Sequence, residues 1–322
     1  MSAFAGKRVV VIGGMGFIGT NLTERLIANG ASVTVLTPLR ERHADQADRF
    51  ERLGARIIEG DVRDRELMPT VVSGQHIIFN LSGQSGAVRS MEDPWSDLDT
   101  NVKGNLVLLE SLRAAGAGAK VVFAGSRLQY GKADRLPVAE EDQGDPLCVH
   151  AIHKRTVEEY LKLYATLFGV TFAIARVTNP YGPGQPKGRT AYGVINRLIH
   201  LALAGEALTI YGDGHQQRDY VHVADVVDAL SLLALSDAAN GRVYNIASGV
   251  GSRMIDVANT IVTIADRGHV EHVEWPALAQ QIETGDFVAD ISRARRELDW
   301  QPKWALRDGL EDAIAYYRAA HS

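Results

Sequence analysis

The stretch that decides the fold of this chain is Lys7-Arg8-Val9-Val10-Val11-Ile12-Gly13-Gly14-Met15-Gly16-Phe17-Ile18-Gly19. Residues 7–12 form a short apolar run that is typical of a buried strand, and residues 13–19 follow with the spacing G-x-x-G-x-x-G. Residues 17–29 then place apolar side chains at helical spacing and end at Gly30, which favours a helix C-cap. Glycines allow the close approach of a pyrophosphate, and a helix N-terminus offers free N–H groups. We therefore expect a nucleotide loop; the alternative is a glycine-rich turn without a ligand.

Strand-like and helix-like segments alternate after this loop. Strands are expected at residues 32–36, 56–59, 76–80, 120–124 and 171–177, and the longest helices at 97–115 and 150–168. Alternation at this spacing predicts a parallel sheet with right-handed crossovers, which is a Rossmann-type, doubly wound α/β fold.

The regular alternation of strands and helices ends after Val177, and turn-forming residues occupy positions 179–184. Shorter helices and strands follow, at 194–204, 208–211, 225–235 and 310–320. We therefore predict a dinucleotide-binding domain at 1–178 and a smaller, mainly substrate-binding α/β domain at 179–322. Elements near 221–248 are candidates for packing back on the first domain. The active site is expected in the cleft between the two domains.

Composition excludes several classes of function. The chain has 322 residues, is 46% hydrophobic and carries a net charge of -5, so it lacks the basic character of a nucleic-acid binder. Its single cysteine, Cys148, permits neither an internal disulfide nor a thiolate zinc site, and no metal is expected. The first strand leaves no room for a signal peptide, and no apolar run is long enough for a membrane span. A soluble, cytoplasmic protein is expected.

The end of the second strand bears on the choice between NAD and NADP. Thr37 stands where NAD sites usually carry a carboxylate for the ribose hydroxyls. Arg40 or Arg42 could bind a 2′-phosphate, although both also fit a solvated charged loop. The sequence leaves both cofactors open and leans to NADP. Asp61 and Val62, which follow the third strand, are further candidate cofactor contacts.

Motifs along nearly the whole chain resemble one family. The most specific is Tyr211-Gly212-Asp213-Gly214-His215-Gln216-Gln217-Arg218-Asp219-Tyr220-Val221-His222-Val223-Ala224-Asp225-Val226. Further matching segments are residues 80–84, 90–94, 101–105, 108–110, 125–131, 176–183, 244–249 and 298–302. Together they resemble the extended short-chain dehydrogenases/reductases of the NAD-dependent epimerase/dehydratase family, which modify nucleotide-activated sugars.

The resemblance implies roles for individual residues. Gly13, Gly16 and Gly19, with Phe17 and Ile18, would hold the dinucleotide pyrophosphate. Leu81, Ser82 and Gly83 would lie under the nicotinamide ribose. The family's chemistry uses a serine or threonine with Y-x-x-x-K, in which the lysine also contacts the ribose. Those positions are Ser126, His150 and Lys154 here, so a histidine replaces the tyrosine.

Three interpretations of His150 are open. Its imidazole could move the proton, because it titrates near neutrality, although its nitrogen ends roughly 2 Å short of a phenol oxygen and a water or a shifted substrate would bridge the gap. Alternatively, Tyr130, Tyr181 or the substrate itself could move the proton. In the third interpretation the protein binds its ligands without catalysis. His153 is expected to be a surface or core histidine.

The residues after Ser126 argue against one class of reaction, and other residues are candidates for binding the substrate. Sugar 4,6-dehydratases carry Asp-Glu after the serine or threonine, whereas this chain has Arg127-Leu128, which argues against that class. Arg218 is expected to bind a diphosphate, Asn179 a phosphate or sugar oxygen, and Gln84 the sugar. Ser82 and Arg89 could also face the sugar.

One segment that binds the diphosphate in the family differs in this chain. The family often has Arg-Pro-Gly-Asp near the end, and this chain has Ile282-Glu283-Thr284-Gly285-Asp286. Arg189 or Arg197 could compensate for the missing arginine, or the substrate could lack the usual diphosphate.

The leading prediction is an NAD(P)-dependent nucleotide-sugar epimerase or related sugar oxidoreductase with Ser-His-Lys in place of Ser-Tyr-Lys. The alternatives are an NADPH-dependent ketoreductase of a small molecule and a catalytically silent dinucleotide-binding protein. By analogy with the family, a homodimer is expected through the helices at 150–168 and 97–115. The apolar residues available to that interface are Leu161, Leu163, Tyr164, Leu167, Leu106, Leu108 and Leu109, which could instead cover the sheet.

Overall fold

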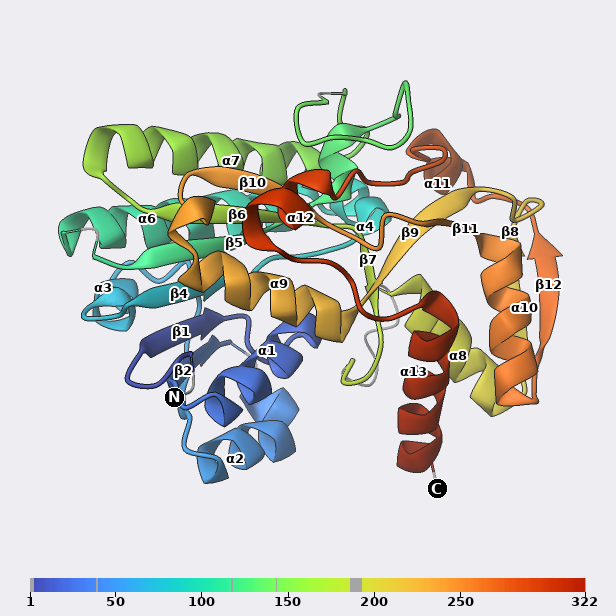
Figure 1. The fold of residues 1–322 in the computed structure, drawn as a ribbon, viewed down its shortest axis with the longest axis horizontal. Helices are drawn as coiled ribbons and strands as arrows, with labels where there is room; N and C mark the ends of the chain where they lie inside the picture. The colour runs from blue at the N-terminus through green and yellow to red at the C-terminus, as the bar shows by residue number, and fades with distance from the viewer. Residues whose placement is uncertain (1–2, 39, 117, 143, 186–192, 322) are drawn as a thin grey trace.

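A parallel sheet of seven strands forms the centre of the protein (Figure 1). The computed structural model describes residues 3–38, 40–116, 118–142, 144–185 and 193–321. The strand order is β10-β6-β5-β4-β1-β2-β3, and every ladder between neighbours is parallel. The strands are β1 (Arg8–Ile12), β2 (Ser32–Thr37), β3 (Arg56–Glu59), β4 (Ile77–Asn80), β5 (Lys120–Ser126), β6 (Phe172–Val177) and β10 (Arg242–Ile246). The order reverses between β1 and β4, as in a doubly wound Rossmann sheet.

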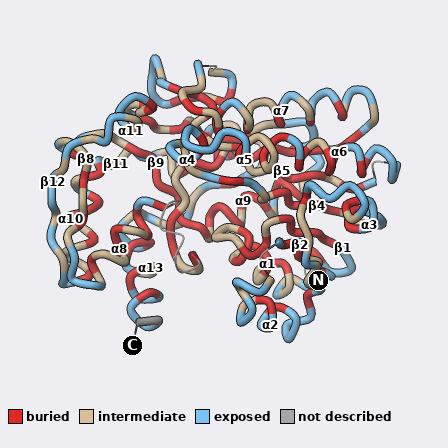
Figure 2. The backbone as a smooth tube through the Cα atoms, turned by 180° about the vertical axis from the view of Figure 1, so that it is seen from behind, coloured by how far each residue is buried: buried red, intermediate tan, exposed pale blue. Residues whose placement is uncertain are grey.

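Helices cover both faces of the sheet, as Figure 1 shows. The helices on one face are α3 (Met68–Val72), α6 (Gly104–Ala114) and α7 (Val149–Phe168). Those on the other face are α1 (Phe17–Ala28), α2 (Ala44–Arg52) and α9 (Val223–Leu235). Along β1, Val9 and Val11 pack into one core whereas Val10 and Ile12 pack into the other. Side chains of a strand alternate between faces, so a strand buried on both sides needs an unbroken apolar run. Figure 2 shows the sheet strands as the buried centre of this unit.

The chain leaves the Rossmann unit after β6 and later returns to it. α9 packs against α1, β5 and β6, and β10 pairs with β6 at the edge of the sheet. Three short strands between and after these segments form a second sheet: β7 (Asn179–Tyr181), β9 (Gln217–His222) and β11 (Gly251–Arg253). β8 (Ala207–Tyr211) pairs with β12 (His269–Val273). A separate apolar core joins α8 (Val194–Ala204), α10 (Met254–Ala265) and α13 (Leu306–His321).

The predicted helix at 97–115 is interrupted in the structure. α5 (Pro94–Leu98) passes through a π-helical segment, Asp99–Lys103, into α6. Within this wide turn, Asn105 Nδ2 donates to the carbonyl of Asn101, 2.7 Å away. π-helical turns often occur at functional sites, and this one brings the side chain of Asn101 to the end of β4.

The remaining elements connect these layers. They are α4 (Ala87–Glu92), α11 (Ala277–Gln281), α12 (Ser292–Leu298), and the 3-10 turns Glu41–His43, Arg127–Tyr130 and Asp237–Ala239. The region 276–286 contains the short helix α11. β7 lies within the predicted loop 179–184 because its three residues pair with β9. Of the helices that the structure describes, none has the length and apolar character needed to cross a bilayer.

Candidate active site

The glycine loop after β1 is packed so closely that side chains would not fit. Gly13 has a φ of +81°, and a Cβ there would lie 2.8 Å from the carbonyl oxygen of Leu81. A Cβ on Gly19 would overlap the carbonyl of Gly13. Phe17 and Ile18 begin α1 directly after the loop, so the N-terminus of this helix faces the same edge of the sheet. Such a backbone surface fits a pyrophosphate, which needs N–H donors and close approach.

A second backbone cradle lies at the end of β4. Gly83 has a φ of +146°, and a Cβ there would overlap Asn101 Oδ1 and lie 3.5 Å from Lys154 Nζ. Ser82 Oγ donates to Asn80 Oδ1 at 2.6 Å, and Leu81 N donates to the carbonyl of Ile12. The structure therefore brings the predicted ribose segment, the glycine loop and Lys154 to one place, which fits a bound dinucleotide.

The predicted contacts to the adenosine end lie further along the sheet, beyond β2 and β3. Thr37 is buried at the end of β2. Arg40 makes a bidentate ion pair with Glu51, with distances of 2.9 and 3.1 Å. Arg63 donates to Asp61, and this hydrogen bond lowers the pKa of the carboxyl group of Asp61. Val62, the neighbour of Asp61, is buried and faces Gly104.

Ser126 and Lys154 meet at the carboxyl end of β5. The hydroxyl of Ser126 accepts from Leu128 N at 3.2 Å, which fixes the side chain at the start of a 3-10 turn. Lys154 Nζ donates to the carbonyl of Ala124 at 2.9 Å and lies 4.7 Å from the centre of the Phe123 ring. Burial lowers the pKa of Lys154 to about 8. The ammonium group of Lys154 thus contacts a backbone carbonyl and an aromatic ring. A ribose hydroxyl would provide a further hydrogen-bond acceptor.

His150 lies in the first turn of α7, one turn before Lys154, and is almost fully buried. Its backbone N–H donates to Ser90 Oγ at 3.0 Å, and its ring Nδ1 lies 3.5 Å from both Asp97 Oδ2 and Asn101 Nδ2. Burial lowers the pKa of His150, and the positive charge of Lys154 acts in the same direction. The imidazole is therefore neutral at pH 7 and able to accept a proton.

Asp97 is a site residue that the sequence motifs did not reveal. Its side chain is fully buried, and its Oδ1 lies 2.6 Å from His153 Nδ1. Burial opposes ionisation of Asp97, but its interactions with the rings of His150 and His153 prevail and lower its pKa. One carboxylate therefore serves two histidines of α7, and His153 has a specific partner. The only sequence signal was the position of Asp97 near the start of the predicted helix.

The two tyrosines considered as substitutes for the missing one are engaged elsewhere. Tyr130 donates its hydroxyl to Asn245 Oδ1 at 2.6 Å, and burial raises its pKa to about 12. Tyr181 donates to the carbonyl of Leu306 at 3.2 Å, and burial raises its pKa also. Neither phenol is prepared to ionise near neutral pH.

The predicted substrate residues Arg218 and Asn179 lie in the smaller unit, and Asn179 also contacts Arg127 of the Rossmann unit. Arg218 donates to the carbonyl of Gly285 at 2.7 Å and contacts the carboxylate of Glu283. Asn179 Nδ2 donates to the carbonyl of Asp219 at 2.8 Å, while its oxygen accepts from Arg127.

The amide of Gln84 is a further buried polar group in the segment after β4. Its oxygen accepts from Ser96 Oγ at 3.0 Å, and its buried Nε2 has no partner among the described residues. Of the two proposed compensating arginines, Arg197 donates to Thr209, whereas Arg189 lies outside the described residues.

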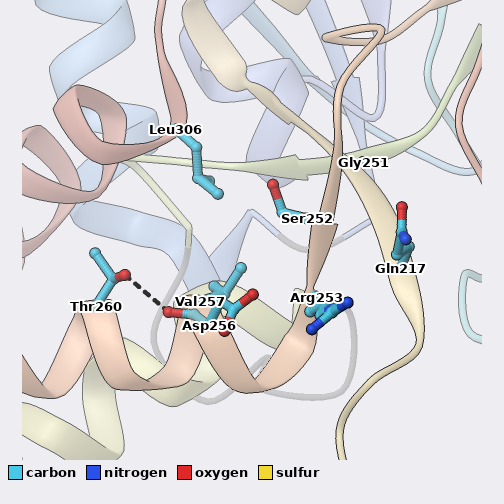
Figure 3. A pocket seen from close by; sticks show the side chains of 8 residues that line it. All are labelled: Gln217, Gly251, Ser252, Arg253, Asp256, Val257, Thr260 and Leu306. Carbon is cyan, nitrogen blue, oxygen red and sulfur yellow. Dashed lines mark hydrogen bonds between the residues drawn. The ribbon is translucent and has the colours of Figure 1, made fainter.

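A separate concavity lies in the smaller unit, between β9, β11 and α10 (Figure 3). It measures about 270 Å³, below the roughly 300–1,000 Å³ that is usual for small-molecule sites. Gln217, Ser252 and Asp256 are among its lining residues, and no predicted site residue is. Gln217 and Arg218 are successive residues of β9, so their side chains leave opposite faces of the strand. This concavity is therefore distinct from the site around Ser126.

The comparisons with known proteins agree with this geometry. A model of the NAD dependent epimerase/dehydratase family matches residues 9–247. The chain belongs to this family. It is 32% identical over 323 residues to the UDP-glucose 4-epimerase of Mycolicibacterium smegmatis, with 97% of this chain and 98% of the relative covered.

Solved structures of epimerases have the same fold as this family member. An epimerase from Methanothermobacter thermautotrophicus superposes with a TM-score of 0.92 at 27% identity, over 99% of this chain and 94% of the other. The UDP-glucose 4-epimerase of Thermus thermophilus, in complex with NAD, gives 0.86 at 28% identity, over 97% and 99%. These matches confirm the predicted fold class and an NAD(P)-dependent enzyme of the extended short-chain dehydrogenase/reductase type.

Proposed function

We propose that this enzyme epimerises the sugar of a nucleoside diphosphate by reversible oxidation, with Ser126, His150 and Lys154 as catalytic residues. The observation that most supports the proposal is the placement of His150 one helical turn from Lys154, with the carboxylate of Asp97 beside its ring. The relatives from Mycolicibacterium smegmatis and Thermus thermophilus, both named UDP-glucose 4-epimerase, support a nucleotide sugar as the substrate.

The side chains divide the work as follows. When bound, the dinucleotide supplies a hydride acceptor that also returns the hydride. Ser126 donates a hydrogen bond to the reacting sugar oxygen, and neutral His150 takes the hydroxyl proton, directly or through one water. Asp97 stabilises the imidazolium and fixes which nitrogen carries the proton. Lys154 would hold the ribose hydroxyls, and its charge adds to burial in keeping the resting imidazole neutral. In an epimerase the same proton returns from His150, so the reaction needs no net proton or redox equivalent.

A ketoreductase that consumes NADPH is the second candidate. It is favoured by Thr37, which places no carboxylate at the end of β2, and by Arg40, whose guanidinium could turn to a 2′-phosphate. The pair of Arg40 with Glu51 is solvent-exposed, and exposed ion pairs are exchanged at little cost. Both NAD and NADP therefore need to be tested.

The deciding experiment is incubation of the purified protein with NAD, NADP or NADPH and a panel of UDP-, dTDP-, GDP- and CDP-sugars. Mass spectrometry coupled to chromatography follows the products. An epimerase gives an unchanged mass at a new retention time, with no net loss of cofactor. A gain of two hydrogens with oxidation of NADPH would establish the ketoreductase. Cofactor binding without any product from the panel would contradict the epimerase and favour a non-nucleotide substrate or a silent binder.

A further inference from the structure

Arg127 is a buried cation directly after Ser126, on the turn that closes β5. Its side chain crosses from the Rossmann unit toward the substrate-binding unit, and the residue is only 9% exposed. Its Nη1 donates to Thr284 Oγ1 at 2.9 Å, and its Nε donates to Asn179 Oδ1 at 3.3 Å. The guanidinium carbon lies 5.4 Å from the ring centre of Phe287. All of these partners are neutral.

The acids around Arg127 are engaged by other groups. Burial lowers the pKa of Arg127 to about 10, and the charge of Arg218 acts in the same direction, while Glu283 and Asp219 oppose them. Glu283 is in contact with Arg218. Asp219 is occupied by Ser248 and by the backbone N–H groups of Gly249 and Ala289. Within the described ranges, Arg127 has no ion pair of its own. Both carboxylates are therefore engaged by other groups, and the contacts that the Arg127 side chain makes with described residues are to neutral groups.

An unpaired buried cation is costly, so a neighbouring anion is the ordinary reason for one. A guanidinium has five N–H donors, and the described acceptors of Arg127 take two of them. The remaining donors can form a fork that matches the two oxygens of a carboxylate or phosphate. A merely structural bridge between Asn179 and Thr284 would not require a charged group.

We propose that Arg127 is a specificity-determining residue that binds an oxyanion of the substrate beside the sugar oxygen held by Ser126. The proposal rests on the proposed function, because it takes the substrate to be a nucleotide sugar. Adjacency to Ser126 favours a carboxylate on the sugar, as in a nucleoside-diphosphate uronic acid. The second source of the same chemistry is a phosphate of the diphosphate, because Arg127 is close to Arg218 and to the segment 282–286.

The test measures binding by calorimetry, with the full-length protein saturated with NAD. The ligands are UDP, UDP-glucose and UDP-glucuronic acid, and the variants are Arg127→Met and Arg127→Lys. If the sugar carboxylate is the anion, the wild type prefers UDP-glucuronic acid over UDP-glucose by about tenfold or more, and Arg127→Met abolishes the preference. If the diphosphate is the anion, Arg127→Met weakens all three ligands by a similar factor and leaves their ratios unchanged.

Thr284→Val is the matched control, because it removes a neutral partner of Arg127 and keeps the charge. Whichever order of ligand affinities the wild type shows, Thr284→Val should show the same order. Equal affinities of the wild type and a folded Arg127→Met for all three ligands would overturn the proposal, as would a wild type that binds none of them. Should Arg127→Met not fold, Arg127→Lys decides, because loss of the planar fork alone must weaken the anionic ligand several-fold.

Binding does not depend on turnover, so the two proposals fail separately. A preference that depends on Arg127 without any epimerisation would contradict the proposed function and support the anion site. Epimerisation together with ligand affinities that are unchanged in Arg127→Met would support the proposed function and contradict the anion site.

Discussion

At position 150 an imidazole stands where the family chemistry expects a phenol, and its surroundings are those of a base. Asp97 faces Nδ1 from α5, and Lys154 and His153 lie on the same helix as His150. The sequence predicted His150 and Lys154 because the spacing of four residues is local. It could not predict Asp97, because no helical or strand periodicity connects that residue to α7.

The pH dependence of kcat/KM should be bell-shaped in the free enzyme. The titratable groups at this end of α7 include Cys148, Asp97, His150, His153 and Lys154, and Glu158 contributes to the potential at Lys154. As the pH falls through the lowered pKa of His150, below about 6.5, the imidazole becomes protonated and can no longer act as a base. As the pH rises above about 8, Lys154 loses its charge and its hold on the ribose weakens. Initial rates at subsaturating sugar measure this profile; a rate that stays flat from pH 5 to 9 would contradict it.

Asp97→Asn should lower kcat by at least about tenfold, because the imidazolium loses its counter-charge. Asp97 raises the pKa of His150, so its removal should move the low-pH limb of the profile to a lower pH. A structural role alone would lower the melting temperature and leave the limb in place. Glu159→Gln, an exposed change on the same helix, is the control for charge at a distance.

At the level of elements, the glycine loop and the end of β4 form the two walls of the cofactor site. The sequence predicted both, because strand, turn and helix signals are adjacent in the chain. It did not predict the π-helical segment Asp99–Lys103, because an added residue in a helical turn leaves the apolar pattern almost unchanged. That segment places Asn101 beside Gly83 and His150.

Gly83→Ala tests how closely these elements meet. A Cβ at Gly83 would overlap Asn101 Oδ1, and its φ of +146° disfavours any side chain. We expect a loss of about 1–3 kcal/mol in unfolding free energy and weaker cofactor binding, followed by denaturation and by fluorescence titration with NADH. Gly118→Ala is the matched control, since nothing lies within 4 Å of a Cβ there. Equal cofactor affinity in both variants would show that the cradle is not needed.

On the scale of the whole molecule, the Rossmann unit is completed by a segment far along the chain. β10 closes one edge of the sheet, and α9 covers β5 and β6. The sequence suggested that elements near 221–248 return to the first unit. It could not specify the partner strand, because strand pairing is decided by the complete set of neighbours.

The expected homodimer stays a prediction, and the structure separates core from surface on α6 and α7. Leu161, Tyr164, Leu108 and Leu109 are buried under the sheet face and are unavailable to a partner. Ile152, Leu163 and Leu167 recur at helical spacing along α7 and are 50%, 49% and 60% exposed. Exposed apolar residues grouped on one helix favour an interface with a second copy.

Sedimentation equilibrium should therefore give the mass of a dimer, and Leu163→Glu should shift the equilibrium to monomers. Leu232→Glu, on the opposite face of the sheet, is the control and should leave the mass unchanged. A monomeric wild type would exclude the dimer.

The sequence by itself determined the alternating strands and helices and the glycine loop, because these depend on periodicity and on spacings of a few residues, and the family resemblance indicated Ser126 and Lys154. Only the tertiary structure decided which groups surround them. His153 meets Asp97 across 56 residues of chain, and Arg127 meets Thr284 across 157. Burial, charge balance and pKa depend on contacts of that range. The family chemistry was therefore visible in the sequence, whereas the carboxylate beside His150 and the unpaired cation beside Ser126 appeared only after folding.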